Sequence, residues 1–127
     1  MTRLLITLIG LHSLALGLLM LAVPRFMLRL LGFTGDIPIF FPSQSGIFLL
    51  VLGICYLIAL REPAFVKVIL ISKAGAVLFL VAHAAFLHAP TIIWAAAGGD
   101  ATMFTALAIA LRLEPATAAG GAASRAR

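Results

Sequence analysis

Four long apolar stretches, separated by short segments that contain proline, dominate the pattern of this chain. They cover residues 4–23, 43–60, 64–87 and 91–111. Each is close to the roughly 20 residues that an α-helix needs to cross a bilayer, and none alternates between apolar and polar positions as a barrel strand would. Because hydrocarbon offers backbone groups no hydrogen-bonding partner, only helices and closed barrels can span it. The pattern predicts four transmembrane helices.

Proline marks the ends of these helices. Pro24 follows the first stretch, Pro38 and Pro42 precede the second, and Pro63 and Pro90 stand before the third and fourth. Proline lacks a backbone donor and restricts the residue before it, so these positions are helix boundaries. No small-residue cleavage site follows the first stretch, and we therefore expect a retained helix rather than a cleaved signal peptide.

Two segments lie outside the four stretches. Residues 25–32 carry Arg25 and Arg29 four positions apart, with apolar residues around them. This pattern predicts a short helix in the membrane interface whose arginines act as anchors, while a plain loop is the alternative. Residues 114–127 are small and polar, which predicts a flexible tail. We expect a single membrane domain over residues 1–113, followed by this tail.

Small residues indicate how the helices pack. Gly10 and Gly17 lie seven positions apart in the first stretch, as do Gly46 and Gly53 in the second, and Gly75 lies in the third. Seven residues are about two helical turns, so each pair lines one face, and small residues allow close helix packing in lipid. The short connections make the second, third and fourth helices neighbours. We predict an all-α, up-down four-helix transmembrane bundle that the first helix closes.

Composition and charge agree with a membrane location. Hydrophobic residues make up 64% of the chain and charged residues 10%, far from the averages of soluble domains. The net charge is +5, but no basic patch with interleaved aromatic residues is present, which argues against nucleic-acid binding. Trp94 and Tyr56 are expected to anchor the chain at the two interfaces.

The distribution of basic residues predicts the orientation. Arg25 and Arg29 fall on one side of the predicted bundle. The other side holds the larger set, so both termini are expected to face the cytoplasm; this set comprises Arg3, Arg61, Lys67, Arg112, Arg125 and Arg127.

Two charged residues lie inside apolar stretches. A charge near the bilayer centre costs roughly 2.5 to 3.5 kcal/mol on insertion scales, so such groups pair, neutralise or face water. At about 1.5 Å per residue, Lys73 lies roughly 13 Å and Asp100 roughly 17 Å from the same side, and His12 lies at a similar depth. We therefore predict that one layer of the bundle holds Lys73, Asp100 and His12.

Two interpretations of this polar cluster remain open. In the first, Lys73 and Asp100 form a buried ion pair that fixes helix register. In the second, the pair and His12 form a proton-responsive or ligand-binding site. We expect no metal site, since His83 and His88 are five positions apart and cannot share a metal on one helix face. The sequence contains no recognisable catalytic motif and leaves the cofactor unknown.

Several short motifs resemble those of a known group. They are PIFFPSQSG, LGICYLIALREP, SKAG with Lys73, and GGDATMF with Asp100. From about Pro38 to Leu113 the chain resembles small bacterial four-helix membrane proteins of the DoxX-like superfamily. The resemblance implies a multi-pass protein of the bacterial inner membrane and a non-catalytic partner of redox systems. No cofactor-binding residues carry over, and the chain has no redox cysteine pair.

Three functions are compatible with these observations. The leading one is a non-catalytic accessory or scaffolding subunit of a larger membrane complex, for example a redox assembly. Its partners would be the lipid bilayer and either a larger membrane protein or further copies of the chain. The alternative is a small transporter or a lipid- or quinone-binding module that uses Lys73, Asp100 and His12. An integral membrane enzyme is disfavoured, because no nucleophile lies next to a base.

Overall fold

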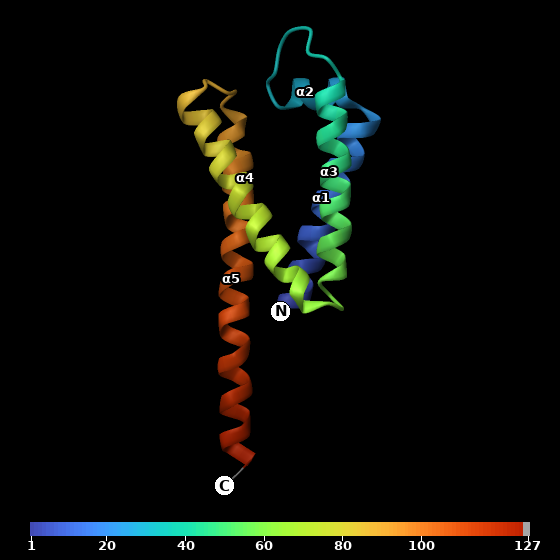
Figure 1. Ribbon diagram of the computed structural model, residues 1–127. Coiled ribbons are helices and arrows are strands. Elements are labelled where there is room, and N and C mark those ends of the chain that lie inside the picture. Colours follow the sequence, from blue (N-terminus) through green and yellow to red (C-terminus); the bar gives the residue numbers. More distant parts are fainter. Residues whose placement is uncertain (126–127) are drawn as a thin grey trace.

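The computed structural model describes the backbone of residues 1–125 and the side chains of residues 1–114, and this part of the chain is helical without strands (Figure 1). Its elements are α1 (Thr2–Ala22), α2 (Pro24–Leu30), α3 (Phe40–Ile58), the short 3₁₀ helix η1 (Pro63–Phe65), α4 (Val66–Phe86) and α5 (Ile92–Arg125).

Four of these segments are long and apolar enough to cross a membrane. They are Thr2–Ala22, Phe40–Ile58, Pro63–Phe86 and Ile92–Glu114. The prediction of an all-α chain with four such helices is confirmed, and the four spans indicate a multi-pass membrane protein. Which side of the membrane each end faces stays a prediction.

The structure bears differently on the predictions for the two segments outside the spans. The structure shows a short helix, α2, where a helix or a loop was expected over residues 25–32. The backbone of α5 continues past the expected end of the fourth span at residue 111. The flexible tail predicted over residues 114–127 lies almost wholly outside the residues whose side chains are described, and it stays a prediction.

The long helices form two antiparallel pairs, α1 with α3 and α4 with α5 (Figure 1). The pairs approach each other at the end that holds Met1 and the α3–α4 connection, which we call the closed end, and they separate toward the opposite, open end. The second and third spans were expected to be neighbours, but α3 and α4 meet only near their connection. The short connection sets the distance between their ends, whereas side-chain packing sets the angle between them.

Glycines bring α1 and α3 into close contact. A Cβ atom at Gly17 would lie 2.8 Å from the carbonyl oxygen of Gly46, and one at Gly53 would lie 2.8 Å from the side chain of Leu14. Gly10 faces α3 in the same way. Gly75, which was expected at a helix contact, has no atom within 4 Å of such a Cβ position. It is exposed because α4 turns this side of its surface away from the other helices.

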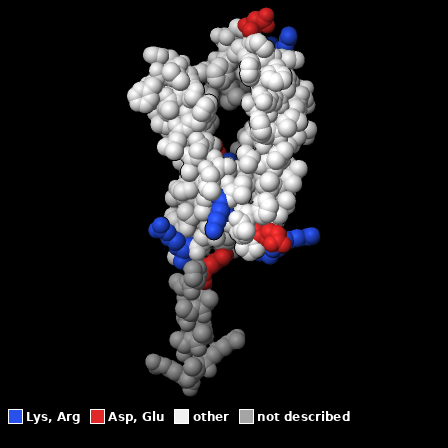
Figure 2. Space-filling model, in the orientation of Figure 1, with Lys and Arg blue, Asp and Glu red and all other residues white. Residues whose placement is uncertain are grey.

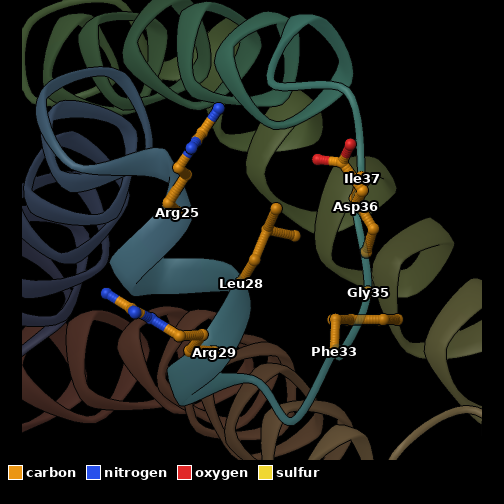
Figure 3. Close-up of a pocket in the computed structure, with 7 residues that line it drawn as sticks. All are labelled: Arg25, Leu28, Arg29, Phe33, Gly35, Asp36 and Ile37. Carbon is orange, nitrogen blue, oxygen red and sulfur yellow. The ribbon is translucent and has the colours of Figure 1, made fainter.

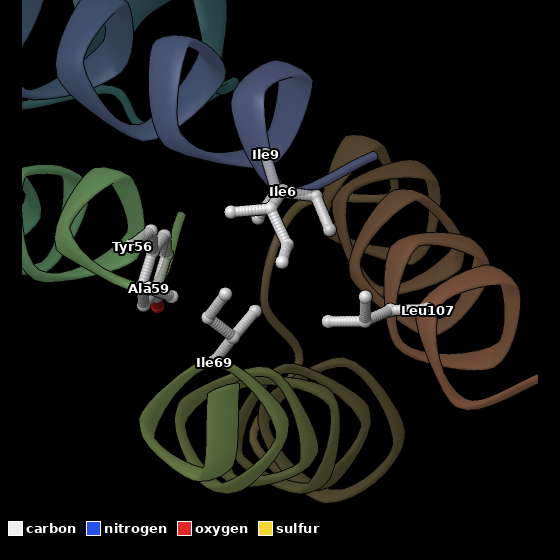
Figure 4. Packing of buried hydrophobic residues seen from close by; sticks show 6 residues of the cluster. All are labelled: Ile6, Ile9, Tyr56, Ala59, Ile69 and Leu107. Carbon is white, nitrogen blue, oxygen red and sulfur yellow. The ribbon is translucent and has the colours of Figure 1, made fainter. Parts of the chain in front are cut away.

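The core lies at the closed end and draws on all four long helices (Figure 4). Ile69 of α4 and Leu107 of α5 are fully buried there. The side chains point toward a common centre between the helices, and the cluster consists of Ile6, Ile9, Tyr56, Ala59, Ile69 and Leu107. Elsewhere large apolar side chains such as Leu78 and Phe86 are exposed, as lipid-facing residues would be.

The two helix pairs touch again at the open end. Gly32 has a φ of +79°, and a Cβ atom there would lie 2.9 Å from Cβ of Pro90. The segment after α2 therefore contacts the α4–α5 connection, and a side chain at position 32 would disturb both the backbone and this contact. The space between the pairs is thus limited by the core at the closed end and by this contact at the open end.

We predict that Gly17→Ala destabilises the protein by about 1–3 kcal/mol, because the added methyl group would press on the backbone of α3. Unfolding by SDS in mixed detergent micelles measures the change. Gly75→Ala is the matched control: it adds the same methyl group at an open helical position, where alanine is neutral or better by up to about 1 kcal/mol. Equal losses in the two variants would contradict glycine-mediated packing of α1 on α3.

Candidate functional site

Lys73 of α4 and Asp100 of α5 form a buried ion pair. Nζ of Lys73 donates a hydrogen bond to Oδ1 of Asp100 at 2.5 Å. The lysine side chain is 6% exposed and the aspartate side chain 17%. The structure therefore brings together the two charges that the sequence predicted at a common depth. Of the two side chains, that of the aspartate is the more exposed.

The pair explains how two charges can lie inside apolar helices. Each group removes the uncompensated charge of the other, and breaking such a pair is costly even where the intact pair adds little net stability. A hydrogen bond between one position on α4 and one on α5 also fixes the sliding register of the two helices. The observed pair is compatible with the structural interpretation, and a proton-responsive or ligand-binding role stays a prediction.

His12 of α1 lies beside this pair without a direct bond to it. Its ring is within electrostatic range of both Lys73 and Asp100. Within the described part of the chain, it makes no hydrogen bond to either of them. His12 is also exposed, so the predicted cluster is a closed ion pair with a histidine at its edge.

A second polar contact links the two helix pairs at the closed end. The hydroxyl of Tyr56 on α3 lies 2.5 Å from Oγ of Ser72 on α4, and Oγ of Ser72 lies 2.6 Å from the carbonyl oxygen of Val68. Since a carbonyl only accepts, Ser72 donates to Val68 and Tyr56 donates to Ser72. Tyr56 was expected to be an interfacial anchor, but it is 2% exposed. The sequence did not reveal that Tyr56 would be buried in the core, with Ser72 of α4 as the hydrogen-bond partner of its hydroxyl.

The other expected anchors lie at the open end. Arg25 and Arg29 are exposed on α2, the short helix next to that end. Trp94, near the start of α5, is 49% exposed. These positions suit contact with an interface, and contact with lipid stays a prediction for all three.

A cleft of about 800 Å³ lies between the two helix pairs toward the open end. We call it the window. Figure 2 shows the opening, with acidic and basic atoms visible at its lower limit. The helices contribute Met20 from α1, Ser45 from α3, Phe79, Leu80 and His83 from α4, and Ile93 from α5. The segments 31–34 and 87–90 form its outer rim.

The window and the ion pair lie at different depths. Leu80 follows Lys73 by two helical turns, and Ile93 precedes Asp100 by two turns, which places the window about 10 Å from the pair. Lys73 and Asp100 lie well inside their spans, whereas the other lysine, arginine, aspartate and glutamate residues of the spans lie near the helix ends at the closed end.

The window is lined mostly by apolar residues, and a few polar residues lie among them. Thr34, Ser45, His83 and His88 supply polar groups near the open end. Nδ1 of His83 lies 2.8 Å from the carbonyl oxygen of Phe79, so this nitrogen carries the proton and Nε2 remains as the second polar atom of the ring. The ring also packs on Phe79, with centroids 3.9 Å apart. The sequence pattern gave no sign of this role for His83, because the residue lines the window only through the tertiary arrangement of the helices.

No group of three or more histidine, cysteine, aspartate or glutamate side chains among the described residues is placed to hold a metal ion. Comparison of the chain with protein-family models, with curated proteins and with solved structures gives no match. The resemblance to the DoxX-like superfamily therefore stays a prediction from short motifs. Fold and site together define a small, all-helical, multi-pass membrane protein with a buried ion pair and a window between two helix pairs.

We predict that Lys73→Met destabilises the protein by about 3 kcal/mol or more, because it leaves the Asp100 carboxylate buried without a partner. The double variant Lys73→Met with Asp100→Leu should recover much of that loss, since no charge remains. Unfolding of both single variants, the double variant and the wild type in detergent forms a double-mutant cycle. Additive losses would show that the two side chains do not interact.

Proposed function

We propose that the chain is a non-catalytic membrane module that binds an amphiphilic, lipid-like molecule in the window. A membrane lipid and an isoprenoid quinone both belong to this class. The observation that carries the proposal is the apolar opening between the two helix pairs, with its polar groups gathered at one end. Its volume of about 800 Å³ is in the range typical of sites for small molecules, roughly 300–1,000 Å³.

The surroundings of the window favour an amphiphile over a water-soluble ligand. The walls belong to helices that are candidate membrane spans, and in a bilayer the medium outside such helices is hydrocarbon. An apolar chain can lie against Leu80 and Ile93, and a polar group can reach Thr34 on the rim and His83 near the end of α4. A charged solute would have to give up its hydration for walls that offer few hydrogen bonds.

The closed end favours binding over transport. The core around Ile69 and Leu107 is fully buried and lies beyond the ion pair. The bond between Lys73 and Asp100 holds α4 and α5 together below the window. A ligand in the window would therefore meet a closed floor, and passage to the other side would require the core to open.

An accessory role in a larger complex is the second candidate. Because α3 and α4 meet only near their connection, the same opening could receive a helix of a membrane protein partner or of a second copy. The four basic residues at the closed end support an orientation with that end toward the cytoplasm; they are Arg3, Arg61, Lys67 and Arg112. A place in the bacterial inner membrane completes this proposal and rests on the resemblance described above.

We predict that Leu80→Trp lowers the amount of lipid or quinone retained in mild detergent by about tenfold. The indole would occupy the window and displace the equivalent of roughly two buried CH₂ groups. Native mass spectrometry of the purified protein measures the bound molecules. Leu78→Trp is the matched control, since Leu78 lies two residues away on the same helix and is 73% exposed.

The same measurement separates the two candidates. A lipid-sized adduct that Leu80→Trp removes and Leu78→Trp keeps supports amphiphile binding. A second polypeptide that shows this dependence supports the accessory role instead. Equal retention of all bound species in the two variants would contradict any function of the window.

A further inference from the structure

A second hollow lies at the open end, between α2 and the segment that leads to α3 (Figure 3). Its volume is about 180 Å³, room for about six water molecules at about 30 Å³ each. This space suits a headgroup and not a whole lipid. Three charged residues line it, namely Arg25, Arg29 and Asp36, and the apolar lining includes Leu28 and Phe33.

The charges around this hollow have no partners within the described part of the chain. Arg25, Arg29 and Asp36 are all exposed, and none of them takes part in an ion pair there. At the bilayer interface, arginine side chains pair with acidic groups of lipids when the protein offers none. The hollow thus presents the positive charge of Arg25 and the negative charge of Asp36, and Arg29 adds positive charge at its edge.

The loop gives the carboxylate a defined direction. In Figure 3 the carboxylate of Asp36 is turned from the loop toward the side of the hollow that holds α2, and Arg25 extends from α2 in the same part of the view. The side chain of Arg29 points away from the loop. Gly35 has a φ of +108°, a conformation that other residues rarely adopt, and this turn places Asp36 opposite the helix.

We infer that this hollow binds a headgroup in which a phosphate is linked through a short chain to a primary ammonium, as in phosphatidylethanolamine. The inference rests on the proposed function, since it identifies the headgroup of the amphiphile whose chain lies in the window. The phosphate would accept hydrogen bonds from the guanidinium of Arg25, with Arg29 adding positive charge at the edge. The ammonium would donate to the carboxylate of Asp36.

The negative charge of Asp36 decides between headgroup classes. A headgroup with a phosphate and no cation would bring a second negative charge near this carboxylate, and like charges at close range repel. A headgroup with an ammonium places opposite charges at both ends of the hollow. The arrangement therefore selects a zwitterionic headgroup with N–H donors over an anionic one.

Phe33 connects the hollow to the window, because its side chain lines both spaces. A lipid whose headgroup lies between Arg25 and Asp36 could direct an acyl chain past Phe33 into the window. The two spaces then form one site, with a charged end in the hollow and an apolar end between the helix pairs.

The test is a competition between two lipids with identical acyl chains. The full-length protein in mild detergent is mixed with equal amounts of phosphatidylethanolamine and phosphatidylglycerol, and native mass spectrometry gives the ratio bound. We expect about a threefold to fivefold preference for phosphatidylethanolamine, the contribution of one exposed ion pair. Asp36→Asn should abolish or reverse this preference, and Arg25→Gln should weaken the binding of both lipids. Asp36 is exposed on a loop and Arg25 is exposed on α2, so these changes are expected to leave the buried core intact.

Each outcome bears on a different proposal. No preference in the wild type, or an unchanged preference in Asp36→Asn, overturns the headgroup assignment while leaving lipid binding in the window intact. A preference that survives in Leu80→Trp, with weaker binding overall, supports the headgroup site independently of the window. Displacement of the lipid by soluble phosphoethanolamine at equal concentration would assign the hollow to a soluble phosphate ester and overturn the lipid assignment.

Discussion

The structure depends on a cluster of buried side chains that all four long helices contribute at the closed end. Ile6 of α1, Tyr56 of α3, Ile69 of α4 and Leu107 of α5 meet there, and the hydroxyl of Tyr56 ties α3 to α4 through Ser72. Away from this core, each helix has one close partner. The two pairs therefore diverge, and the opening between them is a direct consequence of where the core is placed.

Two kinds of contact hold the pairs together internally, and each suits a medium without a strong hydrophobic effect between helices. In α1 and α3, glycines such as Gly17 and Gly46 let backbones approach closely. In α4 and α5, the bond between Lys73 and Asp100 adds an electrostatic contact to the packing of the two helices. Close backbone approach holds the first pair together, and an ion pair contributes to the contact between the helices of the second.

The candidate site was only partly predictable. The depth of Lys73 and Asp100 along their helices follows from 1.5 Å per residue, and this was enough to place the two charges together. His83 and Asp36 were not singled out, because their significance depends on what lies across from them. His83 matters through the window formed with α1 and α3, and Asp36 through a loop turn at Gly35 that faces it toward α2.

The sequence by itself determined the number of spans, their approximate ends and the pairing of the two buried charges. These features follow from the length of apolar runs, from proline and from the cost of an unpaired charge in hydrocarbon. Only the tertiary structure decided that Gly75 lies open, that Tyr56 is buried and that α3 separates from α4. Helix angles arise from side-chain packing between distant segments, and a short connection constrains only the ends of the helices it joins.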